Sequence, residues 1–191
     1  MDTFAYTVNC SILLTDLPLL QRPQAARDAG FDAVEFWWPF AAPVPSDREV
    51  DEFVRAVEDA GVQLTGLNFA AGDMPAGDRG LLSDPAHTLA FRDNIDITVG
   101  IGERLGTKAF NALYGNRVEG VAPDKQDETA TENLALAGKA ADPEHRAEVI
   151  AATIAARYPN QVPIRSASPA PARSLTSGQK VRQLLGRLMV S

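Results

Sequence analysis

Residues 46–68 read SDREVDEFVRAVEDAGVQLTGLN, and this stretch decides the fold. It opens with a capping box, because the Ser46 hydroxyl can accept from the backbone N–H of Glu49 while the Glu49 side chain reaches back. Apolar residues then recur at helical spacing as far as Gly61, a residue suited to the left-handed end of a helix. The run at 62–68 follows directly and predicts a strand. A helix followed by a strand is therefore the repeating unit of this chain.

The unit recurs through the first 141 residues. Strands are predicted at 4–9, 32–37, 62–68 and 108–114, and helices near 16–29, 46–60, 83–105 and 127–140. Strands that alternate with helices form a parallel sheet with right-handed crossovers. We therefore predict an α/β fold, with residues 1–141 forming a partial (β/α) barrel domain of four units. Pro23 falls inside the first helix and is expected to kink or delay it.

Composition and motifs exclude several classes of protein. No apolar run reaches the length of a membrane span, the N-terminus lacks the pattern of a secretory signal, and Cys10 has no second cysteine to pair with. We therefore expect a cytoplasmic protein that does not bind membranes. The net charge of −7 argues against nucleic-acid binding. The chain also lacks a dinucleotide fingerprint, a phosphate-binding loop, a serine elbow and any Cys/His metal motif.

The charge divides sharply along the chain. All 25 acidic residues lie at or before Glu148, so the first 148 residues carry a net charge of −13 and the rest carry +6. We predict that residues 142–191 form a divergent tail with a helix from Asp142 through Ile154, a flexible low-complexity run at 166–174 and a short basic helix at 175–190. This tail is either a basic interaction segment or, in a truncated or frame-shifted chain, foreign to the preceding fold.

Polar residues gather where the predicted strands end. In a βα barrel the active site forms at the C-terminal ends of the strands. Those ends carry Asn9, Glu35, Asn68 and Asn111, which are the candidate substrate-binding residues of the sheet. Asn9 has the alternative of simply turning the chain. Glu35 has the alternative of a structural ion pair with an arginine, because burying an unpaired carboxylate is costly.

The loop at 72–80 is the most informative segment outside the strands. It follows the third predicted strand and contains three glycines together with Asp73, Asp78 and Arg79. Glycines let the backbone approach a ligand closely, and an arginine fork suits a carboxylate. Asp73 and Arg79 are therefore added to the candidate site. The alternative is an ordinary solvated surface loop.

Several motifs in the first 141 residues resemble one enzyme family. They are NCSIL at 9–13, AGFDAVEF at 29–36, NFAAGD at 68–73, AGDRG at 76–80, FRD at 91–93 and ENL at 132–134. Together they resemble the hydroxypyruvate isomerases, which belong to the xylose isomerase-like TIM barrels. The resemblance covers about residues 4–141. Departures from the family pattern are Ala70 in place of proline, Met74 in place of tryptophan, and Pro23.

The resemblance implies reversible conversion of hydroxypyruvate to tartronate semialdehyde, with a small hydroxy-carbonyl acid as the substrate. Moving a proton between adjacent carbons needs a carboxylate base and an electrophile for the developing enediolate. Related barrels use two glutamates and a divalent metal, Mg²⁺ or Mn²⁺. By resemblance, Asn68, Asp73 and Arg79 would line the mouth of the site, and Glu35 would support it.

The family's glutamates and metal ligands come from strands after the fourth helix, and this chain does not match that pattern. No acidic residue follows Glu148, and Glu144 and Glu148 are weak substitutes on the predicted fifth helix. No cofactor is readable from the sequence, and the ligands of the implied metal are not present. The catalytic residues are therefore unassigned.

Three interpretations stay open. The chain is a family member that is inactive alone, a half-barrel enzyme completed by a second copy, or a non-catalytic binding module whose basic tail contacts an acidic partner. A closed TIM barrel typically has eight strands and about 250 residues, which motivates the first two.

Overall fold

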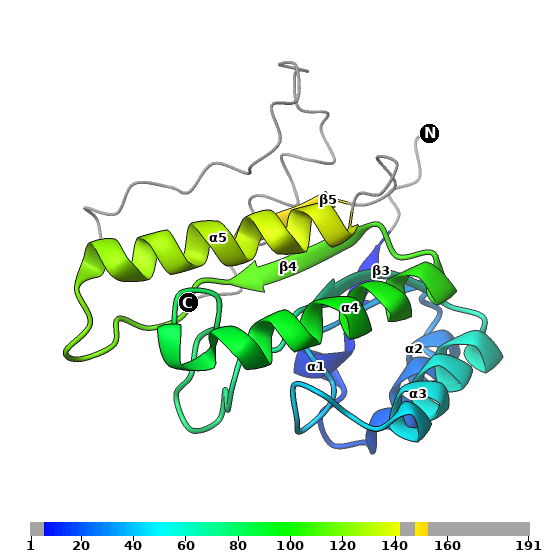
Figure 1. Cartoon of the computed structure of the whole chain (residues 1–191). Coiled ribbons are helices and arrows are strands. Elements are labelled where there is room, and N and C mark those ends of the chain that lie inside the picture. The colour runs from blue at the N-terminus through cyan, green and yellow to red at the C-terminus, as the bar shows by residue number, and fades with distance from the viewer. Residues whose placement is uncertain (1–5, 142–147, 153–191) are drawn as a thin grey trace, which may run out of the picture.

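The computed structural model describes residues 6–141 and 148–152 (Figure 1). Five parallel strands form one sheet in the order β1-β2-β3-β4-β5, which is also their order along the chain. Their bounds are β1 Thr7–Asn9, β2 Ala33–Phe36, β3 Gln63–Asn68, β4 Ala109–Leu113 and β5 Glu148–Ala152. A sheet whose neighbours are consecutive βα units is that of a TIM barrel, and the described residues form part of such a barrel.

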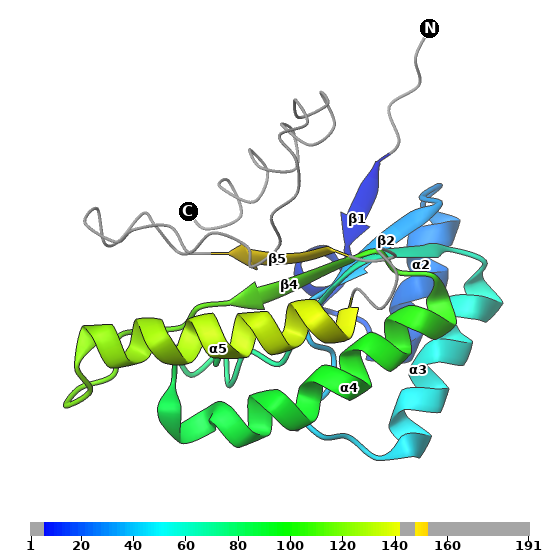
Figure 2. The same cartoon turned by 45° about the horizontal axis from the view of Figure 1, so that its top comes forward.

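The helices cover one face of this sheet (Figure 2). They are α1 (Cys10–Leu13), η1 (Leu19–Gln21), α2 (Arg22–Asp28), α3 (Asp47–Ala60), η2 (Pro85–His87), α4 (Thr88–Leu105) and α5 (Pro123–Ala141), where η marks a 3₁₀ helix. No helix in the described part of the chain has both the length and the apolar character that crossing a membrane requires.

The capping box predicted at the start of α3 is confirmed. The backbone N–H of Ser46 donates to Oε2 of Glu49 (2.8 Å), and the Ser46 hydroxyl accepts from the backbone N–H of Glu49 (3.4 Å). The helix ends at Gly61, whose φ of +64° is the predicted left-handed conformation. The apolar stripe of α3 is buried through Phe53, Val54 and Val57.

The core lies between the sheet and the helices. Its largest buried side chains include Phe36, Phe53, Phe69, Phe91 and Phe110, and neighbouring rings meet at centroid distances of 5.2 to 5.8 Å. Ring pairs at this spacing add to the free energy gained from burying their area. α4 packs tightly on β4, since a Cβ at Gly102 would overlap the ring of Phe110. The helix layer therefore fixes the positions of the strands.

The opposite face of the sheet is different. Side chains alternate along a strand, and in β2 and β4 the helix-facing positions are buried while the others are only half-buried. The half-buried positions include Glu35 in β2 and Asn111 in β4. No helix of the described part covers this face (Figure 2), which we call the inner face.

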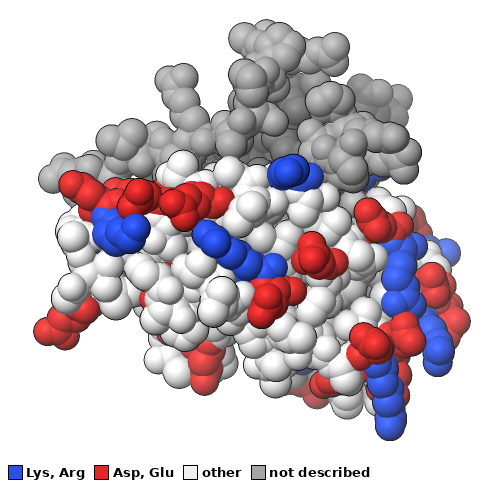
Figure 3. Space-filling view, viewed as in Figure 1, with Lys and Arg blue, Asp and Glu red and all other residues white. Residues whose placement is uncertain are grey.

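The helix side carries both signs of charge, interspersed on its surface (Figure 3). Exposed ion pairs link Arg104 of α4 to Asp51 of α3 (2.8 Å) and Arg92 of α4 to Glu132 of α5 (3.2 Å). Exposed pairs contribute little stability, so the apolar core and not these contacts holds the helices in place.

The prediction of a helix from Asp142 through Ile154 is wrong over residues 148–152, the part of this range that the structure describes. Residues 148–152 form β5, which pairs in parallel with all of β4 from Ala109↔Glu148 to Leu113↔Ala152. The β-branched Val149 and Ile150 suit a strand, and a short apolar run cannot be assigned by periodicity alone. Glu148 therefore begins a strand.

Pro23 delays the first predicted helix rather than kinking it, and α2 begins only at Arg22. It occupies the first turn of α2, where the missing N–H has no partner to lose, and the chain before it forms the separate η1. The predictions of a flexible run at 166–174 and a basic helix at 175–190, and Glu144 itself, lie outside the described residues. The division of the chain at residue 142 stays a prediction.

Candidate functional site

Asn9 and Glu35 meet at the C-terminal ends of β1 and β2. The two residues are register partners, and Nδ2 of Asn9 donates to Oε1 of Glu35 (2.9 Å). The other end of the same amide, Oδ1, accepts from the backbone N–H of Ser11 (2.9 Å) and caps α1. Asn9 thus turns the chain, as its alternative interpretation held, and also holds the carboxylate of Glu35.

Glu35 makes no ion pair with any arginine of the described residues, so the alternative of a structural ion pair has no support there. Its side chain lies beside Gly66 of β3, where a Cβ would come 3.5 Å from Oε2. Glu35 is the only Asp or Glu in β1 to β4. The inner face of these strands therefore presents one half-buried carboxylate, held by a neutral partner.

Cys10 lies next to this pair but is not a nucleophile. Burial raises the pKa of its thiol to about 11, nearby Arg22 lowers it, and Glu35 adds to the rise. The thiol is fully buried and stays protonated at neutral pH.

Asn68 and Asn111 form a second pair at the ends of β3 and β4. They are also register partners, Asn68 is only 7% exposed, and Asn111 is half-buried. Neither side chain forms a hydrogen bond with another residue of the described part, and Oδ1 of Asn111 is buried without a partner. All four strand-end candidates thus lie at one edge of the sheet, as predicted from their positions.

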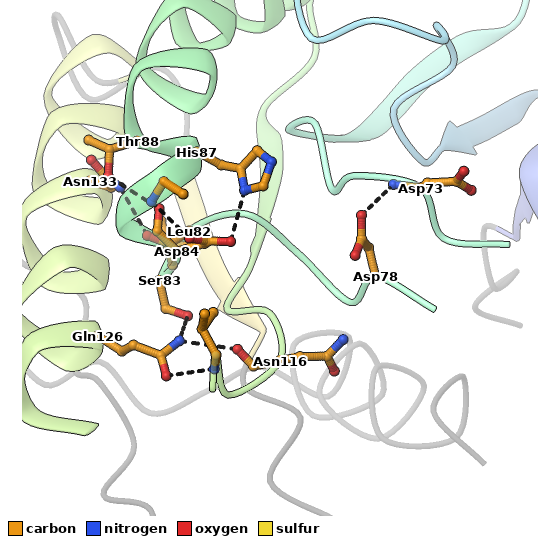
Figure 4. Close-up of polar contacts among 12 residues, drawn as sticks. Asp73, Asp78, Leu82, Ser83, Asp84, His87, Thr88, Asn116, Gln126 and Asn133 are labelled. Carbon is orange, nitrogen blue, oxygen red and sulfur yellow. Dashed lines mark hydrogen bonds and ion pairs between the residues drawn. The ribbon is translucent and has the colours of Figure 1, made fainter. Parts of the chain in front are cut away.

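The aspartates of the 72–80 loop shape the loop itself (Figure 4). Oδ2 of Asp78 accepts from the backbone N–H of Asp73 (2.7 Å), and Oδ1 of Asp73 accepts from the backbone N–H of Ala76 (3.0 Å). The guanidinium of Arg79 donates to the carbonyls of Met74 (3.1 Å) and Asp78 (2.6 Å) but is exposed. Asp73 and Asp78 therefore order the loop, and Arg79 keeps a charged group at its surface.

This loop is anchored to the end of β4. The backbone N–H of Leu82 donates to the carbonyl of Leu113 (3.2 Å), and a Cβ at Gly80 would overlap that same oxygen. Nδ2 of Asn116, in the loop after β4, donates to the carbonyl of Gly77 (2.9 Å). The loops that follow β3 and β4 are thus joined at the edge that carries the candidate site.

Buried amides on the helices hold these loops in place, and the sequence analysis missed them. Gln126 of α5 donates to Ser83 Oγ (3.2 Å) and to the carbonyl of Asn116 (3.1 Å), and Nδ2 of Asn133 donates to the carbonyl of Leu82 (2.9 Å; Figure 4). Asn94 of α4 accepts from the backbone N–H of Ala70 (2.8 Å). The sequence offered one signal for such residues, which is an amide side chain among the apolar residues of a predicted helix. Asn94, directly before Ile95, is an example.

Tyr114, directly after β4, anchors the next loop. Its hydroxyl bonds to Asp127, and Arg117 donates to the same hydroxyl (2.8 Å) while pairing with Asp127 (3.0 Å). Burial, followed by the hydrogen bond to Asp127, raises the pKa of Tyr114 to about 12. Tyr114 is therefore a neutral structural phenol at physiological pH.

The metal of related barrels does not fit the residues that the structure describes. Within residues 6–141 and 148–152, no three side chains of His, Cys, Asp or Glu lie close enough together to hold an ion. The site supplies a carboxylate, three strand-end amides and an exposed guanidinium. These groups can bind and orient a small polar acid, and Glu35 can accept a proton.

The chain matches known proteins over this same region. The model of the family described as "Xylose isomerase-like TIM barrel" matches residues 23–153. A putative hydroxypyruvate isomerase of Streptomyces coelicolor is 58% identical over 139 residues, which are 72% of this chain and 50% of that protein. The hydroxypyruvate isomerase of Escherichia coli is 30% identical over 132 residues, which are 69% of this chain and 49% of that protein.

A solved structure has the same architecture. The crystal structure titled AP endonuclease, family 2, from Brucella melitensis superposes with a TM-score of 0.63 at 28% identity, covering 78% of this chain and 55% of that one. The chain thus spans about half the length of the curated relatives it matches. Since the family model covers most of this chain and the fold agrees, the chain belongs to the xylose isomerase-like TIM barrel family.

Proposed function

We propose that this chain carries part of the site of an isomerase that interconverts hydroxypyruvate and tartronate semialdehyde. The observation that carries the proposal is the alignment of Asn9–Glu35 and Asn68–Asn111 along one sheet edge. The name of the relative that is 58% identical supports the choice of substrate. This chain spans only half of that relative. The activity named for the whole relative is therefore a proposal for this chain.

The reaction moves one proton between neighbouring carbons. A base removes a proton from the hydroxymethyl carbon of hydroxypyruvate, the electrons form an enediolate, and a proton returns to the former carbonyl carbon. The hydroxyl oxygen of the starting compound then becomes the aldehyde oxygen. Glu35 is the carboxylate available to the inner face of β1 to β4, and we assign it the role of base.

The geometry around Glu35 suits this role. One of its oxygens, Oε1, is occupied by the Asn9 amide, which fixes the carboxylate, and Oε2 has no protein partner in the described part of the chain. From the family resemblance we assign the exposed guanidinium of Arg79 to the carboxylate of the substrate, which its planar fork suits. Asp73 contributes by ordering the loop that carries Arg79.

The test is proton exchange by the full chain. Hydroxypyruvate is incubated with the protein in D₂O, with and without Mg²⁺, and proton NMR follows loss of the C3 proton signal and formation of tartronate semialdehyde. We expect Glu35→Gln to lower the rate about 100-fold or more, since general bases contribute on this scale. Glu103→Gln, an exposed glutamate of α4, is the matched control and should leave the rate unchanged.

Two outcomes contradict the proposal. Absence of exchange above the buffer rate in every condition removes the isomerase function from this chain and favours an inactive family member or a binding module. Exchange that survives in Glu35→Gln removes Glu35 as the base. The full-length hydroxypyruvate isomerase of Escherichia coli serves as the positive control for the assay.

A further inference from the structure

Asn68 and Asn111 differ from the fully buried amides of the helices in the described chain. Asn94, Gln126 and Asn133 are each 0% exposed, and each uses both ends of its amide in hydrogen bonds to the protein. The amides of Asn68 and Asn111 make none with the described residues. The three amides that hold loops in place thus have protein partners at both ends, whereas the amides of Asn68 and Asn111 have none among the described residues.

The open atom has a defined chemistry. Oδ1 of Asn111 is a buried acceptor without a donor, and nearly all buried polar groups of proteins are hydrogen-bonded. A group that binds this atom must therefore be a donor. A substrate carboxylate or carbonyl oxygen cannot meet this need, but a hydroxyl can.

The strand register places this acceptor on the same face of the sheet as the proposed base. Glu35 is the register partner of Gly66, and Gly66 precedes Asn68 by two residues, so Glu35 and Asn68 face the same side of the sheet. Asn68 is in turn opposite Asn111 on β4. The two amides and the carboxylate thus face the same side of the sheet on three consecutive strands.

We propose that the Asn68–Asn111 pair is the subsite that recognises the hydroxyl next to the substrate carbonyl. Oδ1 of Asn111 accepts from that hydroxyl, and the amide of Asn68 donates to the carbonyl oxygen. The pair selects small 2-oxo acids that bear a hydroxyl on the neighbouring carbon over those that lack it. This inference rests on the proposed function for its substrate class.

Binding to the full chain tests the subsite. Hydroxypyruvate and pyruvate, which lacks the hydroxyl, are titrated into ¹⁵N-labelled protein while the side-chain amide signals of Asn68 and Asn111 are followed. We expect both amides to shift and hydroxypyruvate to bind about tenfold more tightly than pyruvate, the scale of one hydrogen bond. Asn111→Leu should abolish this preference, lowering the affinity for hydroxypyruvate about tenfold and leaving that for pyruvate within twofold.

Thermal stability separates this role from a structural one. If the acceptor is open in the free protein, replacing Asn111 by leucine of similar size removes an unsatisfied polar atom, so the melting temperature stays or rises. A structural amide would instead lower the melting temperature on replacement. Gln24→Leu is the control, since this exposed amide of α2 bonds only to Asp28 (2.8 Å) and should change neither affinity.

The subsite and the proposed reaction fail separately. A hydroxyl preference that is lost in Asn111→Leu but present in Glu35→Gln supports the subsite even when no proton exchange occurs. Equal binding of the two acids, no binding of either, or a lowered melting temperature with the preference intact would each overturn the subsite, even in an active enzyme.

Discussion

At the scale of single residues, the site is built from neutral amides around one carboxylate. Strand-end position was enough to predict that Asn9, Glu35, Asn68 and Asn111 lie at one edge, because parallel strands bring their C-terminal ends together. The bonding of Asp73 and Asp78 was not predictable in this way. It depends on turns with positive φ at Gly72 and Gly77, where the carboxylates meet backbone N–H groups of their own loop.

Cys10 offers a direct measurement of folding at this scale. It is the only cysteine, it is fully buried, and its thiol pKa is about 11, so both access and ionisation oppose reaction at pH 8. We expect a thiol reagent such as iodoacetamide to leave the folded chain unmodified and to label it fully in urea. Rapid labelling without denaturant, measured by mass spectrometry, would contradict the burial of Cys10.

At the scale of elements, the sequence predicted the features that depend on a few adjacent residues, such as the starts and ends of helices. The Ser46–Glu49 capping box and the left-handed Gly61 are properties of a few adjacent residues, and the structure shows both. β5 was missed because its pairing with β4 is a contact across the sheet that periodicity does not contain. α1 was missed because its four residues are too few for a periodic pattern.

The loop between β3 and η2 gives a prediction at this scale. Gly77 and Gly80 both have positive φ, +114° and +131°, but a Cβ has open space at Gly77 and overlaps the Leu113 carbonyl at Gly80. Both alanine variants bear the backbone strain, and only Gly80→Ala adds a clash. We expect Gly80→Ala to lower the free energy of unfolding by about 1–3 kcal/mol more than Gly77→Ala.

Urea unfolding followed by circular dichroism measures this difference. Equal losses in the two variants would mean that the loop can move away from β4 at little cost. The anchoring of the candidate site through Gly80 would then be wrong.

At the scale of the whole molecule, the two faces of the sheet are unequal. Parallel sheets are normally covered on both faces, and here the described helices cover one. Within the described part, β1 and β5 are also the two open edges. The number of βα units in the sequence indicated an incomplete barrel. The sequence did not show which side chains lie on the inner face, because that depends on the register between strands.

This asymmetry predicts self-association. Open parallel edges and a half-buried inner face favour pairing with a second copy. Light scattering coupled to size exclusion should give at least twice the chain mass of 20.5 kDa at micromolar concentration, falling on dilution. A constant mass of 20.5 kDa at every concentration would contradict this and indicate that the chain covers its own inner face.

The double use of the Asn9 amide has a consequence for which substitutions this position tolerates. Asparagine and aspartate are about equally good at starting a helix, so a cap position ordinarily exchanges them freely. Here the oxygen is committed to Ser11, which turns the NH₂ group toward Glu35. Aspartate would cap α1 equally well, but it would set a second carboxylate against Glu35 in place of the NH₂ group that donates to it. A change from NH₂ to oxygen, which the helix start tolerates, thus decides whether Glu35 faces a hydrogen-bond donor or another carboxylate.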